Sequence, residues 1–118
     1  MTTYVKEGAE TIDVGLGKMK DAMIKDYVGF MPPKDEVRKK MCEEYENNFT
    51  ITYGKKYIKI TEKGGGVKAF VVGVDNDKKF KKGDILKPAG WAAPARNAAR
   101  GNILEGGYPI NWTGPLYL

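Results

Sequence analysis

The chain has 118 residues, of which 42% are apolar and 30% charged, with a formal net charge of +5. These values are typical of one folded domain and argue against a disordered chain, and no apolar run approaches the roughly 20 residues of a bilayer span. With one cysteine and no histidine, an intramolecular disulfide and histidine-based nucleophiles are excluded, and a metal site or cofactor is not expected. The lone cysteine and the absence of an apolar leader indicate a cytoplasmic protein.

The charge is divided unevenly along the chain. Residues 1–48 carry a net charge of −2, whereas residues 49–118 carry ten lysines and two arginines against three aspartates and two glutamates, a net charge of +7. A basic half is typical of a protein with an anionic partner, although lysines also keep exposed strands unpaired. We expect a single domain over 1–118, acidic and helical over 1–48 and basic and β-rich over 49–118.

The first expected element is a helix over residues 15–30. Apolar side chains recur there at spacings of three and four residues, which predicts one buried face. Proline cannot continue a helix, so Pro32 and Pro33 end it. The residues of this face are Leu16, Met19, Met23 and Tyr27.

A second helix is expected over residues 33–48. Asp35 and Glu36 complement its N-terminus. Val37, Met41 and Tyr45 stand four residues apart, and such a stripe is typical of core packing.

The rest of the chain predicts short strands. Residues 49–53 and 56–61 alternate apolar and polar side chains around a turn at Gly54, which predicts a hairpin. Further strands are expected over 67–74, 84–87 and 108–112. The predicted fold class is therefore α+β: two N-terminal helices followed by a small, curled antiparallel sheet or partly open barrel.

The segment "KPAGWAAPARNAARGN", residues 87–102, is rich in small residues and offers little to bury. Between Pro94 and Gly101 we expect one or two helical turns. Arg96 and Arg100 would then share one face, where two guanidiniums can bind phosphate.

Trp91 precedes these arginines and is suited to stack on a base. Four lysines of the basic half would add attraction that does not depend on base sequence. In the alternative interpretation, Trp91 is a core anchor and the arginines pair with Glu105 and Asp84. The four lysines are Lys55, Lys56, Lys59 and Lys68.

The stretch "VDNDKKF" places Asp75 and Asp77 before two lysines. Carboxylates followed by lysine at a strand end are found in magnesium-dependent nucleases. A third acidic partner is missing at any recognisable spacing, and Asp-Asn-Asp also favours a simple turn.

The C-terminus is unusually apolar, which predicts that it docks on its own sheet or on another subunit. A homo-oligomer through this end is one expectation. The residues concerned are Tyr108, Trp112, Leu116, Tyr117 and Leu118.

The segments "KGDILK", "APARN-ARGN" and "WTG" resemble a group of small uncharacterised proteins of marine bacteriophages. The resemblance spans residues 55–114 and leaves the acidic helical segment outside. It implies a viral, intracellular origin, in the host cytoplasm or the virion, and carries no known activity.

Together these patterns favour a non-enzymatic module that binds nucleic acid or another polyanion through Trp91, Arg96, Arg100 and the four lysines. A virion structural or assembly protein is the alternative, and a metal-dependent nuclease is the third hypothesis. Salt dependence separates the first from the second, because nucleic-acid affinity falls steeply with added salt.

Overall fold

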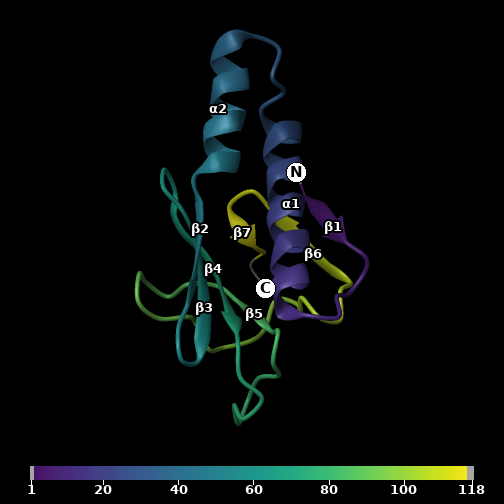
Figure 1. Ribbon diagram of the computed structural model, residues 1–118, viewed down its shortest axis with the longest axis vertical. Helices are drawn as coiled ribbons and strands as arrows, with labels where there is room; N and C mark the ends of the chain where they lie inside the picture. The colour runs from purple at the N-terminus through teal and green to yellow at the C-terminus, as the bar shows by residue number, and fades with distance from the viewer. Residues whose placement is uncertain (1, 117–118) are drawn as a thin grey trace.

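The computed structural model describes residues 2–116, and within them the chain forms two helices and seven short strands (Figure 1). The α+β class is confirmed. The predicted order is wrong in one respect, since a strand at the N-terminus precedes the helices. The elements are β1 (Thr3–Val5), α1 (Ile12–Phe30), α2 (Glu36–Asn47), β2 (Phe49–Tyr53), β3 (Tyr57–Glu62), β4 (Gly66–Val72), β5 (Ile85–Leu86), β6 (Tyr108–Asn111) and β7 (Gly114–Pro115).

Helix α1 forms as its periodicity predicts. The Thr11 hydroxyl accepts from the amide of Val14 at 3.2 Å and caps the N-terminus, which satisfies one of the free amides of the first turn. All four residues of the predicted apolar face are buried. Neither helix among residues 2–116 is long and apolar enough to span a bilayer.

Helix α2 is capped by Asp35, whose carboxylate accepts from the amide of Arg38 at 2.9 Å. The predicted stripe is buried only at Tyr45, whereas Val37 is 70% exposed and Met41 37% exposed. The expectation of core packing is wrong for these two residues because the first turns of α2 stand beyond the strands, and only its last turn reaches them (Figure 1).

The strands form two antiparallel sheets rather than the single curled sheet or barrel that was expected. One has the order β2-β3-β4-β5, with Ile51 opposite Ile60 and Ile58 opposite Val71. The other has the order β1-β6-β7, so the N-terminal strand pairs with a C-terminal one. Within residues 2–116 the sheets do not close into a barrel.

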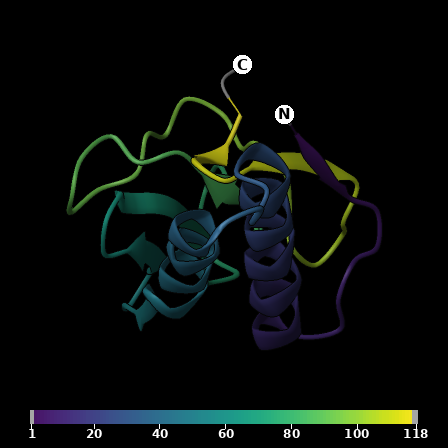
Figure 2. The ribbon, with the colours of Figure 1, turned by 90° about the horizontal axis from the view of Figure 1, so that it is seen from above.

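The main core lies between α1 and both sheets. Seen from above, α1 and α2 lie side by side, with the strands behind them and to either side (Figure 2). The core includes Leu16, Met19, Met23, Ile60, Val71, Ile103 and Ile110. A second cluster of Phe70, Val72, Phe80 and Leu86 occupies the opposite face of the four-stranded sheet, so β4 is covered on both sides.

The segment 87–102 contains no helix, so the predicted turns after Pro94 are wrong. The amide of Ile85 donates to the carbonyl of Gly101, and the amide of Arg100 donates to the carbonyl of Ile85, both at 2.8 Å. These groups are therefore paired as in a sheet. The backbone passes close to Tyr108 at Gly101. A Cβ atom at this position would stand 2.5 Å from the Cβ of Tyr108, so only glycine permits this approach.

Candidate nucleic-acid interface

On the side away from the helices, strands β2 and β3 of the four-stranded sheet present an open surface next to the Phe70 cluster that covers β4. Successive residues of a strand point to opposite faces, so Ile58 and Ile60 enter the core while their neighbours in β3 face outward. We call this surface the outer face. It consists of Thr50, Thr52, Tyr57, Lys59 and Thr61, all exposed or half-buried.

Trp91 lies against this outer face and is 66% exposed. The Nζ atom of Lys59 is 4.2 Å from the centroid of its indole ring, a cation–π contact. Trp91 stands at the tip of a tight loop, in which the amide of Ala95 donates to the carbonyl of Lys87 at 2.7 Å. The loop therefore presents a large aromatic ring beside a lysine.

Two hollows flank the contact between Lys59 and Trp91. One, of about 220 Å³, is lined in part by Lys55, Lys56, Lys59 and Ala92. The other, of about 390 Å³, is lined by Trp91 together with polar residues of α2, β2 and β3. The structure thus brings together four of the seven predicted site residues: Lys55, Lys56, Lys59 and Trp91.

Arg96 binds a carboxylate of its own chain. Its two terminal nitrogens each lie 3.0 Å from an oxygen of Asp77, and one also donates to the Tyr57 hydroxyl. Lys56 approaches the same carboxylate at 3.0 Å. The Arg96 guanidinium, followed by two backbone amides and Lys56, holds the pKa of Asp77 far below its ordinary value. Arg96 therefore fastens the Trp91 segment to the loop after β4.

The alternative interpretation of the sequence paired the arginines with carboxylates of the same chain, Glu105 and Asp84. Arg96 does form such a pair, but its partner is Asp77. Glu105 instead accepts from Lys81 at 2.5 Å. Asp84 accepts from Asn102 at 2.9 Å. These pairs join loops that lie about 20 residues apart in the sequence, and no local pattern indicates them.

Arg100 does not act together with Arg96. It is half-buried and donates from Nη1 to the carbonyl of Ala98 at 3.1 Å. Its Nε atom is buried and has no hydrogen-bond partner within the described part of the chain. Because the expected helical turn is absent, the two guanidiniums have no common face.

Lys68 is separated from the other predicted lysines because only 4% of it is exposed. Strand β4 has an irregular register opposite Ile60 and Thr61, where Ala69 and Val67 are the paired residues and Lys68 is passed over. This bulge turns Lys68 toward the helices, where its Nζ lies 3.9 Å from Glu62. Strict alternation from the sequence does not reveal this, since bulges depend on strand pairing.

The two aspartates of the nuclease hypothesis occupy different surroundings. The side chain of Asp77 is covered by Arg96 and Lys56, whereas Asp75 is exposed. Among residues 2–116, no three acidic or cysteine side chains are grouped so that they could hold a metal ion. The environment of Asp77 favours a structural role in the loop.

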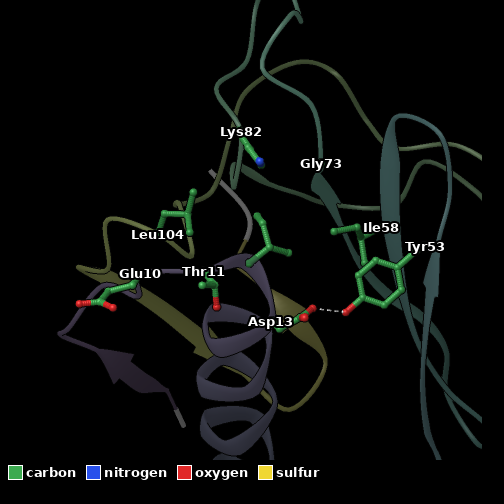
Figure 3. Close-up of a pocket in the computed structure, with 9 residues that line it drawn as sticks. Glu10, Thr11, Asp13, Tyr53, Ile58, Gly73, Lys82 and Leu104 are labelled. Carbon is green, nitrogen blue, oxygen red and sulfur yellow. Dashed lines mark hydrogen bonds between the residues drawn. The ribbon is translucent and has the colours of Figure 1, made fainter.

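A further cavity of about 470 Å³ opens beside the N-terminus of α1 and contains none of the predicted site residues. The Tyr53 hydroxyl donates to Asp13 at 2.6 Å across its edge, and Leu104 lies on the far side (Figure 3). This hydrogen bond is the main cause of the raised pKa of Tyr53. Residues from six separate parts of the chain line the cavity, so sequence reasoning missed it.

A family model described as a family of unknown function, DUF7717, matches residues 6–117. The chain belongs to this family. The match includes both helices, whereas the resemblance to bacteriophage proteins drawn from the sequence covers residues 55–114. No curated protein and no solved structure matches the chain.

Proposed function

We propose that this member of DUF7717 binds single-stranded nucleic acid on the outer face. The observation that carries the proposal is the exposed ring of Trp91 beside Lys59, with a hollow on each side. Stacking of a base on an aromatic side chain contributes about 1–3 kcal/mol and needs no particular base. A single strand offers unpaired bases for such stacking, whereas a duplex hides them.

The charges on this surface suit a phosphate backbone. Lys55, Lys56 and Lys59 line the same hollow, and Asp77, the carboxylate beside Lys56, is already balanced by Arg96 and Lys56. The hollow beside Trp91 has one carboxylate in its lining, Glu62, together with Lys63. Three lysines on phosphates of a single strand give a slope of log affinity against log salt of about −2.

Arg96 has a positioning role in this proposal rather than a direct grip on phosphate. Its bonds to Asp77 and Tyr57 hold the Trp91 segment in place, which lowers the entropy lost when a ligand orders the loop. Arg100 and Lys68, half-buried and buried, lie outside the proposed contact surface. The resemblance to bacteriophage proteins would place this activity in an infected cell.

A salt-titrated binding assay tests the proposal. Fluorescence anisotropy of labelled twelve-nucleotide DNA and RNA strands, and of a duplex of equal length, would be measured with the full chain. We expect the single strands to bind more tightly and to lose roughly 20-fold in affinity between 50 and 200 mM salt. Trp91→Ala should weaken binding by about 5- to 150-fold, with unchanged unfolding.

Matched variants control for general charge. Lys59→Met removes a lysine of the outer face, and Lys25→Met removes an exposed lysine of α1. Equal binding by wild type and Trp91→Ala would refute the stacking role. Light scattering beside the assay addresses the assembly hypothesis, which predicts a concentration-dependent mass and association that tolerates salt.

A further inference from the structure

Another cavity with polar lining residues lies on the helix side of the four-stranded sheet, opposite the outer face. The proposed nucleic-acid binding does not use it. Its volume is about 260 Å³. It is closed by the ends of α1 and α2, the glycine-rich turn between β3 and β4, and the turn between β6 and β7. The residues used below are Glu44, Tyr45, Glu62, Gly65, Lys68 and Trp112.

One wall of the cavity is a fixed aromatic cluster. The rings of Tyr27 and Tyr45 are stacked with centroids 4.2 Å apart, and Trp112 meets Tyr27 edge-on at 5.4 Å. The Tyr45 hydroxyl donates to the carbonyl of Trp112 at 2.5 Å, and the amide of Trp112 donates to Asp26 at 2.9 Å. These bonds fix the backbone of Trp112, and the contacts of its ring with Tyr27 and Phe30 position the indole, so the wall is formed without a ligand.

Lys68 supplies a buried cation at this wall. Its Nζ lies 5.5 Å from the ring centroid of Trp112 and 5.9 Å from that of Tyr45. Glu62 is 3.9 Å away, too far for a hydrogen bond, and one of its oxygens accepts from the amide of Gly64 at 2.8 Å. Burial lowers the pKa of Lys68, and Glu62 offsets part of this effect.

The ammonium of Lys68 has three N–H donors and forms no hydrogen bond within residues 2–116. Burying such a group without an acceptor is costly, so an acceptor oxygen in the cavity would bind it favourably. Counting Lys68, Glu62 and the exposed Glu44 at the rim, the cavity has two negative charges and one positive charge. A purely anionic ligand would satisfy Lys68 but would meet two carboxylates.

We propose that this cavity binds a small zwitterion of the α-amino acid class. The carboxylate accepts from Lys68, the ammonium faces Glu44, and the apolar side chain lies against Trp112 and Tyr45. Such a ligand matches both signs of charge and the aromatic wall, and the volume limits it to a small molecule. The site shares Asn48 and Glu62 with the hollow beside Trp91 but uses none of the lysines of the outer face.

Three probes of one shape test this assignment. L-leucine carries both charges, 4-methylpentanoate lacks the amine, and 3-methylbutylamine lacks the carboxylate. In a Trp91→Phe variant, Trp112 is the sole tryptophan of the chain, so its fluorescence reports the cavity. Calorimetry on the unmodified full chain gives the affinities. We expect L-leucine to bind at least tenfold more tightly than either probe with one charge.

Variants separate the two contacts. Lys68→Met combined with Glu62→Gln removes both buried charges while keeping their shape, and should lower L-leucine affinity at least tenfold. Glu44→Gln should reduce L-leucine to the affinity of 4-methylpentanoate, whereas the neighbouring Glu43→Gln, which does not line the cavity, should have no effect.

Gly65→Ala gives an independent variant if the double substitution fails to fold. Its Cβ would stand 2.3 Å from the Nζ of Lys68 and displace the ammonium, whereas Gly17→Ala adds a methyl group in open space. Loss of L-leucine binding only in Gly65→Ala supports the site. Absence of L-leucine binding at 20 mM, or equal binding of the three probes, would overturn it.

Discussion

The molecule contains two lysine–tryptophan pairs on opposite faces of one sheet. Lys59 and Trp91 meet at 4.2 Å on the outer face, where the indole is 66% exposed. Lys68 and Trp112 meet at 5.5 Å beneath the helices, where the lysine is 4% exposed. The same pair of residue types therefore occurs once with an exposed ring and a half-buried lysine, and once with a buried lysine.

The two proposals rest on burial, rather than residue type, as the property that sets what such a pair can bind. An exposed cation is well hydrated and attracts a polyanion at long range, and salt screens this attraction. A buried cation has lost most of its water and needs a specific acceptor at hydrogen-bond distance. In the two proposals the outer pair therefore meets a polymer, and the inner pair meets a small molecule.

The largest expected effect concerns the stability of the two tryptophan sites. Trp112→Ala removes ring contacts with Tyr27, Phe30 and Tyr45 and should lower the free energy of unfolding by about 3 kcal/mol. Trp91→Ala removes an exposed ring and should change it by less than about 0.5 kcal/mol. Urea unfolding measures both free energies. Equal losses for Trp112→Ala and Trp91→Ala would show that the two rings do not differ in their contribution to stability.

A smaller loss of unfolding free energy is expected for Asp77→Asn. This change removes the carboxylate that binds Arg96 and so holds the loop that carries Trp91. Because the folded pKa of Asp77 is depressed, its contribution to stability is complete above about pH 5 and is lost as the pH falls below the unfolded value of about 3.9. The stability gap between wild type and Asp77→Asn should therefore narrow between pH 5 and pH 3.

Urea unfolding across this range checks the prediction. Asp75→Asn, at an exposed neighbour, controls for loss of a carboxylate. If the difference in unfolding free energy between wild type and Asp77→Asn stays constant with pH, the ionised Asp77 carboxylate does not stabilise the fold.

The lysines of the two pairs should differ in their effect on nucleic-acid binding. Lys59→Met should make the slope of log affinity against log salt about 0.7 less negative. Lys68→Met should leave the slope unchanged, since the buried ammonium does not reach the outer face. Anisotropy at four salt concentrations measures the slopes, and a change for Lys68→Met of the same size would contradict the assignment.

The smallest expected effect is at the cavity of about 470 Å³ beside the N-terminus of α1. Tyr53→Phe removes the hydrogen bond to Asp13 and should cost about 0.5–1 kcal/mol of unfolding free energy. Tyr4→Phe, at a phenol that is also more than half exposed, should cost less. Urea midpoints compare the two, and equal costs would show that the Asp13 contact contributes nothing.

Much of the fold could be predicted because the relevant signals are local. The buried face of α1 follows from a 3.6-residue period, and the β2–β3 hairpin follows from alternation around Gly54. Strands β1 and β7 were missed because each is too short to show a pattern. Their formation depends on pairing with β6, and in the case of β1 the partner lies about 100 residues away.

The candidate site was predicted less completely for the same reason. Lys55, Lys56, Lys59 and Trp91 gather on one surface, but Arg96 finds Asp77, 19 residues away. Lys68 is turned inward by the bulge. The predicted docking of the apolar C-terminus can be followed only in part. The ring of Trp112 packs on Tyr27 and Phe30 of α1, while Tyr117 and Leu118 lie outside the described residues.

By itself the sequence determined a helix over residues 15–30, which the structure extends to Ile12–Phe30, the hairpin that follows α2, the basic character of the second half and the absence of histidine chemistry. Only the tertiary structure decided which lysine is buried, and that Arg96 pairs with Asp77 while Arg100 donates to a backbone carbonyl. The physical reason is that periodicity and turn propensity act between near neighbours, whereas burial and ion pairing depend on segments that meet only when the chain has folded.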